Sequence, residues 1–172
     1  VRTYISAGTS FNPSAESLTL AANNAQLAPE TATSYELGGS WTVTEGLRLN
    51  GSVFRIEKRN ARTSDPANAT LQVLDGIVRV DGFEISAVGQ VTPEWNIMVG
   101  YTRLNSEIVE SNNPNEVGRE FANVAPNTAS LWTTYNLPHG IQIGGGVSYV
   151  DRRYGNTSNT VQEPAYTQFD AA

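Results

Sequence analysis

Cysteine is absent from this 172-residue chain, which excludes disulfide bonds and thiolate metal sites. Charged residues are scarce at 16%, and 17 acidic against 11 basic side chains give a net charge of −6. That sign argues against a nucleic-acid partner and against binding to an anionic membrane surface. Apolar runs are only a few residues long, so the sequence predicts no transmembrane helix. A membrane β-barrel stays possible, because its strands leave only a weak alternating signal.

The chain does contain a two-residue alternation of apolar and polar side chains. From Tyr35 to Val43 the apolar residues occupy the odd-numbered positions and the polar residues the even-numbered ones, so each set has its own parity. Because strand side chains alternate between faces, this pattern predicts a sheet with one apolar and one polar face. The same pattern recurs over residues 83–91, 95–102, 130–137 and 141–149.

Three short turns divide the chain into hairpins, at Thr44–Gly46, Thr92–Glu94 and Pro138–Gly140. Longer polar segments alternate with these turns, as surface loops do, at Asn12–Thr33, Ala61–Thr70, Ser111–Asn123 and Gly155–Ala165. The sequence therefore predicts about eight strands. They are expected over 2–11, 34–43, 47–60, 71–91, 95–110, 125–137, 141–154 and 166–172.

Sorting of short turns to one end and long loops to the other is typical of an outer-membrane barrel. Aromatic residues bracket several apolar faces, as Tyr35 and Trp41 do, and resemble the girdles of such barrels. Two alternatives stay open. One is a soluble sheet, sandwich or ligand-binding barrel with its apolar face against a core. The other is a self-contained small outer-membrane barrel with an adhesive or structural role, in which the segments near Val1 and Ala172 would pair.

Two further features bear on the architecture. Phe54 and Ile56 fall on the polar parity of their strand, which indicates either a β-bulge or a strand that continues above the membrane belt. The polar faces elsewhere carry mostly Gly, Ser and Thr, which are too small to fill the interior of an eight-stranded barrel. The sequence thus favours a wider barrel filled by something else.

Catalytic chemistry has no support in the sequence, which predicts that the chain is not an enzyme. His139 is the single histidine and lies in a Pro-His-Gly turn. Gly144–Gly146 lacks the strand-to-helix context of a phosphate-binding loop. No nucleophile–base pair and no metal-ligand spacing is present.

Segments distributed along the chain form an ordered set of motifs. Leu27–Gly38 reads LAPETATSYELG, and a Gly-aromatic-Glu step follows at Gly82–Glu84. The set also includes Ser10–Pro13, Val53–Arg62, Asp75–Asn105, Val124–Asn156 and Glu163–Ala171. In this order and spacing the motifs resemble the barrel of TonB-dependent outer-membrane receptors, especially the ferric-siderophore branch.

The resemblance implies an antiparallel up-and-down transmembrane β-barrel of about 22 strands with a plugged lumen. Residues 1–172 would supply about eight consecutive strands of one barrel domain, with short periplasmic turns and long extracellular loops. The chain begins without Met and stops inside an expected strand. The plug domain, the early strands and the C-terminal closing strands are therefore expected outside it.

The resemblance also implies location in the bacterial outer membrane and TonB-dependent uptake of ferric siderophores. The ferric siderophore would be the transported ligand, with no cofactor bound directly. The expected partners are the TonB energy-coupling complex, reached through the missing N-terminal part, and outer-membrane lipid and lipopolysaccharide.

The candidate ligand site is the cluster Arg152, Arg153 and Tyr154 at the loop end of its strand. Iron–siderophore complexes are often anionic, and Arg with Tyr supplies charge, hydrogen bonds and a stacking face. Further candidates are Arg119 and Phe121 from a long loop and Trp132 from the wall. The alternative for these residues is cross-strand ion pairing or lipopolysaccharide contact at the rim.

Two glutamates, Glu36 and Glu84, are predicted to face the lumen, because a charge at membrane depth on the lipid side is costly. The family resemblance implies that such wall groups hydrogen-bond to the plug. The alternative is a solvated wall carboxylate.

Overall fold

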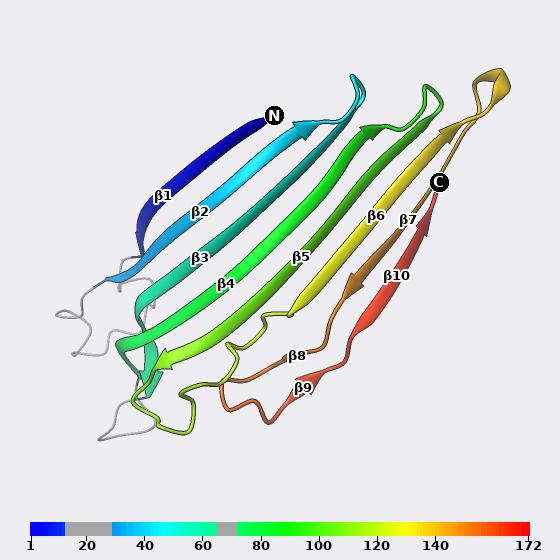
Figure 1. Cartoon of the computed structure of the whole chain (residues 1–172). Helices are drawn as coiled ribbons and strands as arrows, with labels where there is room; N and C mark the ends of the chain where they lie inside the picture. Colours follow the sequence, from blue (N-terminus) through cyan, green and yellow to red (C-terminus); the bar gives the residue numbers. More distant parts are fainter. Residues whose placement is uncertain (13–28, 65–71) are drawn as a thin grey trace.

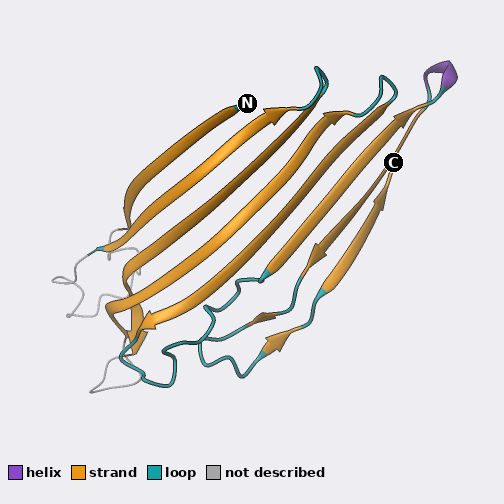
Figure 2. Ribbon diagram, viewed as in Figure 1, coloured by secondary structure: helices purple, strands orange, loops and turns teal. Residues whose placement is uncertain are grey.

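The computed structural model of the chain describes residues 1–12, 29–64 and 72–172. Eight antiparallel strands form one sheet in the order β1-β2-β3-β4-β5-β6-β7-β10. Figures 1 and 2 show a single layer in which each of these strands lies beside its predecessor. The predicted antiparallel up-and-down architecture is therefore confirmed as part of a barrel wall. The strands are β1 Arg2–Asn12, β2 Glu30–Thr42, β3 Leu47–Ser64, β4 Gln72–Gln90, β5 Trp95–Glu110, β6 Asn127–Asn136, β7 Gln142–Val150 and β10 Tyr166–Ala171.

The three short turns lie together at one end of the sheet, and the long connections lie at the other (Figure 1). The third turn includes the 3-10 segment η3 (Pro138–Gly140), where His139 and Gly140 have φ values of 69° and 76°. Of the four expected loops, those over 12–33 and 61–70 fall mostly on 13–28 and 65–71, outside the described residues. No helix in the described parts of the chain is long and apolar enough to cross a membrane.

Several predicted strand limits are wrong. β2 begins at Glu30 and β3 runs to Ser64, so both strands extend into segments expected to be loops. The predicted strand over 141–154 ends at Val150 instead. Beyond it, β8 (Arg153–Tyr154) pairs with β9 (Gln162–Glu163) in a separate hairpin. Pro164, which has no N–H to donate, separates β9 from β10 and helps to end the ladder there.

A bulge does not explain the parity of Phe54. The register of β3 with β2 and β4 is unbroken through this region, and the irregularity falls at Asn60, which has a φ of 55°. Phe54 lies on the polar face and covers Gly82, its register partner, where a Cβ would stand 2.6 Å from the Phe54 ring. The strand simply continues beyond the belt, which is the second of the two expected explanations.

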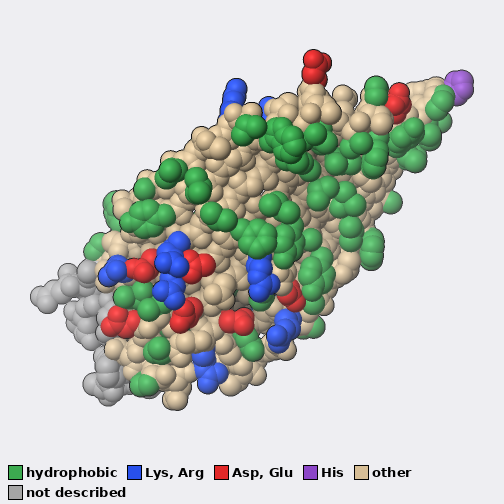
Figure 3. All heavy atoms as spheres, viewed as in Figure 1, with side chains coloured by type: hydrophobic (Ala, Val, Ile, Leu, Met, Phe, Trp, Pro, Cys, Tyr) green, Lys and Arg blue, Asp and Glu red, His purple; other side chains and the backbone are tan. Residues whose placement is uncertain are grey.

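Residues of the apolar face are exposed or partly exposed on every strand from β2 to β10. Leu37, Trp41 and Ile143 are 53%, 54% and 52% exposed. Figure 3 shows hydrophobic side chains gathered over the half of this face nearer the turns. One register row consists entirely of apolar residues: Trp41, Leu49, Ala87, Val99, Leu131, Val147 and Phe169. The apolar positions extend over nine residues in stretches such as Tyr35–Val43, which matches a tilted membrane-spanning strand of about 9–11 residues.

The apolar residues of this face do not gather into a core within the described residues, as the soluble alternative requires. Among the described residues only Ala61, Val78 and Ile108 form a buried hydrophobic core, and they lie near the loop end. The self-contained small barrel is also disfavoured, because β1 and β10 occupy opposite edges of the sheet rather than pairing with each other.

Candidate functional site

The loop over residues 111–126 folds back onto the polar face of the sheet. The Phe121 N–H donates to Oγ of Ser106 at 3.1 Å, and Ser106 is buried beneath the loop. Arg119 O accepts from the Ile108 N–H at 2.9 Å, and Gly118 N–H donates to Ile108 O at 2.9 Å. Because Ser106 and Ile108 share the parity of the lumen-facing residues, this loop lies over the inner side of the wall at its loop end.

A second loop, over residues 151–165, is joined to the first. Asn159 bonds the backbone of Glu120 twice: its Oδ1 accepts from the Glu120 N–H and its Nδ2 donates to Glu120 O, each at 2.9 Å. The Asn123 N–H donates to Tyr154 O at 2.7 Å. Arg119 donates to the carbonyl of Ser158. The two loops therefore form one hydrogen-bonded unit, which we call the paired loops (residues 111–126 and 151–165).

Hydroxyl and carboxylate groups anchor the paired loops to β3. Thr63 Oγ1 and Ser111 Oγ lie 2.9 Å apart, and Ser111 Oγ donates to Glu116 Oε2 at 2.8 Å. Thr157 Oγ1 donates to the other oxygen of that carboxylate at 2.8 Å. Thr63 is only 5% exposed, so this chain of bonds also satisfies a buried hydroxyl.

Asp151 fixes the point where the chain leaves the sheet. Its carboxylate accepts from Asn127 Nδ2 at 2.6 Å, from the Arg152 N–H at 2.8 Å and from the Tyr149 hydroxyl at 3.2 Å. The hydrogen bond from Asn127 is the main cause that lowers the pKa of Asp151 from its ordinary value. Partial desolvation acts in the opposite direction, and the Arg152 N–H, the Tyr149 hydroxyl and the Arg152 charge add smaller lowering effects. Asp151 is therefore held as a carboxylate.

The three candidate arginines are used differently. Arg153 forms an ion pair with Glu163 across the β8–β9 hairpin. Arg119 donates to the carbonyls of Asn115 and Ser158, so its guanidinium holds the paired loops together. Arg152 is exposed, and its guanidinium makes no hydrogen bond or ion pair within the described residues. Of the three, Arg152 is the most available to an anionic ligand.

Five of the six candidate ligand residues come together in the paired loops: Arg119, Phe121, Arg152, Arg153 and Tyr154. The sixth, Trp132, stands apart on the polar face of β6, five residues from the strand's loop end at Asn127. Its indole covers Gly146, where a Cβ would stand 2.5 Å from Cε3. Trp132 thus has a packing role in the wall, and its contact with a ligand stays a prediction.

Glu36 and Glu84 both lie on the polar face, as their parity predicts. Glu36 Oε1 accepts a hydrogen bond from the hydroxyl of Tyr4. Glu84 makes no hydrogen bond or ion pair within the described residues, and it lines a hollow of about 420 Å³ in the inner wall. Hydroxyl and amide side chains line the same hollow, contributed by Tyr4, Ser40, Asn50, Ser52, Ser86 and Thr102.

Sequence reasoning missed the residues that join the paired loops, above all Glu116 and Asn159. Asn159 has a φ of 52°, a conformation that Asn tolerates better than most residues. The Asn-rich run from Asn156 to Asn159 was a local turn signal. Asn159 bonds Glu120, 39 residues away in sequence, and Thr157 bonds Glu116, 41 residues away. Nothing local in the sequence indicates these pairings.

Comparison with known proteins agrees with this geometry. The family described as "TonB dependent receptor-like, beta-barrel" matches residues 1–172. The chain is 36% identical over 165 residues to a probable TonB-dependent siderophore receptor, PiuA, of Acinetobacter baumannii, covering 89% of this chain and 22% of that receptor. It is 29% identical over 149 residues to the catecholate siderophore receptor Fiu of Escherichia coli K12, covering 86% of this chain and 19% of that receptor.

The fold matches as well. The crystal structure of the siderophore receptor PiuA from Acinetobacter baumannii superposes with a TM-score of 0.89 at 34% identity, covering 98% of this chain and 26% of that one. The chain thus spans about a quarter or less of the length of the receptors it matches. These relatives are transport receptors rather than enzymes. The chain belongs to the TonB-dependent receptor family, and its strands form part of the transmembrane β-barrel of an outer-membrane receptor.

Proposed function

We propose that the intact receptor takes up ferric siderophores across the outer membrane in a TonB-dependent manner. Residues 1–172 would supply part of one barrel domain, with the plug, the early strands and the closing strands contributed by the rest of the protein. The observation that carries this proposal is the 36% identity to a siderophore receptor over 89% of the chain. The ferric siderophore is the cargo in this account, and the chain has no catalytic role.

The paired loops support the proposal physically. They fold over the inner side of the wall at the end opposite the short turns, where a ligand arriving from outside would meet the lumen. Their internal hydrogen bonds hold the loop backbones before any ligand arrives, which reduces the entropy cost of binding. Arg152 offers an uncommitted positive charge, and Phe121 and Tyr154 offer aromatic faces from the same unit.

Uptake of radioactive iron tests the function. A strain that lacks the receptor gene should lose uptake of one ferric siderophore and regain it with the wild-type gene, but only when TonB is present. Within the intact receptor, Arg152→Ala plus Arg153→Ala should weaken siderophore binding. Arg48→Ala is a matched control, because Arg48 lies beside the first short turn at the far end of β3. Undiminished affinity of the double variant rejects the site assignment, whereas TonB-independent uptake rejects the function.

We also propose that Glu36 and Glu84 contact the plug. Both lie on the inner face, and Glu84 is exposed and has no partner among the described residues, so its carboxylate is free to accept a hydrogen bond from the plug. Coupling to the TonB complex would then run through the N-terminal part of the protein and this contact. A cysteine at Glu84 should crosslink to cysteines placed in the plug, and a cysteine at the neighbouring, outward-facing Ile85 should not. Equal crosslinking from both positions would reject the assignment.

A further inference from the structure

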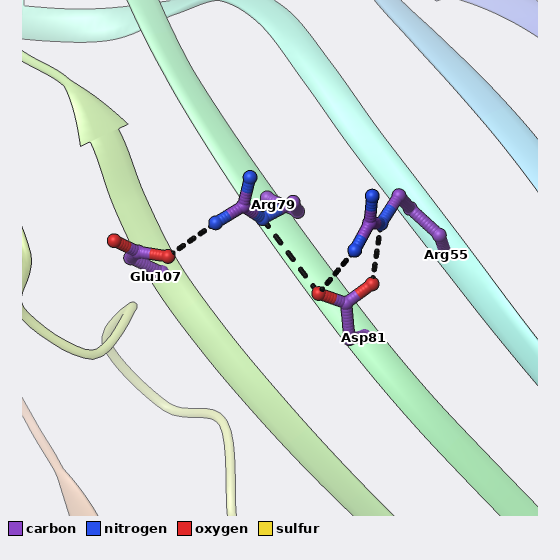
Figure 4. Close-up of polar contacts among 4 residues, drawn as sticks. All are labelled: Arg55, Arg79, Asp81 and Glu107. Carbon is purple, nitrogen blue, oxygen red and sulfur yellow. Dashed lines mark hydrogen bonds and ion pairs between the residues drawn. The ribbon is translucent and has the colours of Figure 1, made fainter.

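Neighbouring arginine and carboxylate side chains on the strands of this sheet form ion pairs. Arg55 Nε lies 2.6 Å from Asp81 Oδ1 (Figure 4). Figure 4 also shows Arg79, whose Nη2 lies 2.5 Å from Glu107 Oε2. In both cases the arginine and the carboxylate are register partners on adjacent strands. A carboxylate that lies within reach of a guanidinium is thus captured by it in this part of the wall.

Asp151 and Arg152 depart from this pattern. The two residues are adjacent in the chain, and the Arg152 side chain forms no ion pair with Asp151 or with any other described carboxylate. Uncharged donors occupy both carboxylate oxygens of Asp151 instead. Oδ2 accepts from Asn127 Nδ2 at 2.6 Å, and Oδ1 accepts from the Arg152 N–H at 2.8 Å and from the Tyr149 hydroxyl at 3.2 Å. The carboxylate is therefore engaged, and the guanidinium beside it stays free.

Asn127 makes the shortest of these hydrogen bonds, and its amide has a fixed direction. The Asn127 backbone oxygen accepts from the Asp151 N–H at 2.9 Å, in addition to the bond between the side chains. Its Oδ1 accepts from the Tyr101 hydroxyl at 2.8 Å and from Arg103 Nη1 at 3.0 Å. An amide oxygen only accepts and an amide nitrogen only donates, so these two donors on β5 turn Nδ2 toward Asp151.

Asn127 also stands between Asp151 and a second cation. Arg103 is its register partner on β5, and Asp151 bonds it from the other side. The hydrogen bond from Asn127 does most to lower the pKa of Asp151, and the nearby charge of Arg152 contributes least to that lowering. Arg152 thus lies close enough to act on the carboxylate. It is the partner that Asp151 would acquire without the amide, because a charge-assisted hydrogen bond is stronger than a neutral one.

We infer that Asn127 is a positioning residue for ligand binding: by engaging Asp151, its side chain keeps the Arg152 guanidinium free for an anionic ligand. The inference deepens the proposed function and rests on it for the role of Arg152 as a siderophore contact. Asn127 acts without touching the ligand. An exposed ion pair favours its closed form by at most about fivefold, so loss of the amide should lower the apparent affinity for the anion by roughly two- to sixfold.

Modification of Arg152 by phenylglyoxal, a reagent for free guanidinium groups, tests the inference in the intact receptor. Peptide mass spectrometry gives the rate at Arg152, which Asn127→Ala should lower by about two- to sixfold. Asn127→Ala plus Asp151→Asn should restore the wild-type rate, because no carboxylate remains to capture the guanidinium. Asn136→Ala is the matched control: it changes the same residue type at the short-turn end of β6, where Asn136 Oδ1 accepts from Gln142 Nε2, and should leave the rate unchanged.

Affinity for the ferric siderophore whose uptake the receptor restores should follow the same order. A merely structural role of Asn127 predicts the opposite, namely that Asp151→Asn adds to the loss. An unchanged Arg152 rate in Asn127→Ala, or no recovery in the double variant, overturns the inference. The expected rates with unaltered siderophore affinity also overturn it, although the proposed function then survives. Absence of any siderophore uptake contradicts the proposed function, and the modification rates still decide whether Asn127 keeps Arg152 free.

The single variant Asp151→Asn provides a test that does not need Asn127→Ala to fold. No ion pair is lost in this variant, so Arg152 should react with phenylglyoxal at close to the wild-type rate. A severalfold faster reaction would show that Asp151 already pairs with Arg152 in the wild-type receptor, and would overturn the inference.

Discussion

The contact between Trp132 and Gly146 gives a sharp test of how the inner wall is packed. The two residues are register partners on β6 and β7, and the indole lies over the glycine. A Cβ at position 146 would stand 2.5 Å from Trp132 Cε3 and 3.1 Å from the Leu131 carbonyl oxygen. Carbon atoms in contact are normally about 3.5–4.0 Å apart, so Gly146→Ala must displace the indole by about 1 Å. We expect this substitution to lower the free energy of unfolding by about 1–3 kcal/mol, the usual cost of overpacking.

Urea unfolding of the intact receptor in detergent micelles measures this loss. Gly145→Ala is the matched control, because Gly145 is the next residue on the opposite face and its Cβ would meet only Asp170 O, at 3.5 Å. In a Trp132→Ala background the cost of Gly146→Ala should almost vanish, which gives a coupling energy of about 1–3 kcal/mol. Equal effects at the two glycines, or no coupling to Trp132, would refute the packing described for this wall.

Two predictions concern the loops. Asn159→Ala removes two hydrogen bonds to the Glu120 backbone and one to Asn156 O, at about 1 kcal/mol each, so amide exchange at Glu120 should accelerate roughly 30- to 150-fold. Exchange mass spectrometry checks this, and unchanged exchange would show that the loops are not joined. The lowered pKa of Asp151 means that its stabilising contribution is complete above its unfolded pKa, near 3.8, and is lost only as the pH falls through the still lower folded value. The Arg152 amide should therefore be equally protected at pH 7 and at about pH 4.5, after correction for intrinsic exchange, and loss of protection at the lower pH would contradict the assignment.

The sheet could be predicted because its signal is local and repeated. Alternation from Tyr35 to Val43 and from Trp95 to Thr102 sets which side chains share a face, and the tight turns set the pairing. The observed register keeps every one of these residues on its predicted face. Strand ends were predicted less well, because Glu30 to Thr33 is mostly polar and resembles a loop, although its backbone pairs with β1 and, from Thr31 on, with β3.

The loops could not be predicted in the same way. Arg153 and Glu163 form an ion pair across the β8–β9 hairpin. The sequence indicated a polar loop between these two residues but not that they would pair. Arg119 was expected to contact a ligand from its charge, whereas its guanidinium is committed to backbone carbonyls. Such partnerships depend on how two distant segments fold together, and residue type alone does not specify them.

The direction of the apolar face is the claim on which the whole account depends, and spin labelling in the membrane measures it directly. Single labels at Val99 and Ile143, and at Thr102 and Ser148 on the opposite face, would be attached through cysteines in a cysteine-free intact receptor. The account predicts that labels at Val99 and Ile143 are relaxed strongly by oxygen, which partitions into lipid, and weakly by a water-soluble nickel chelate. Labels at Thr102 and Ser148 should show little oxygen contact. High nickel access at Val99 and Ile143, with oxygen contact at Thr102 and Ser148, would contradict it.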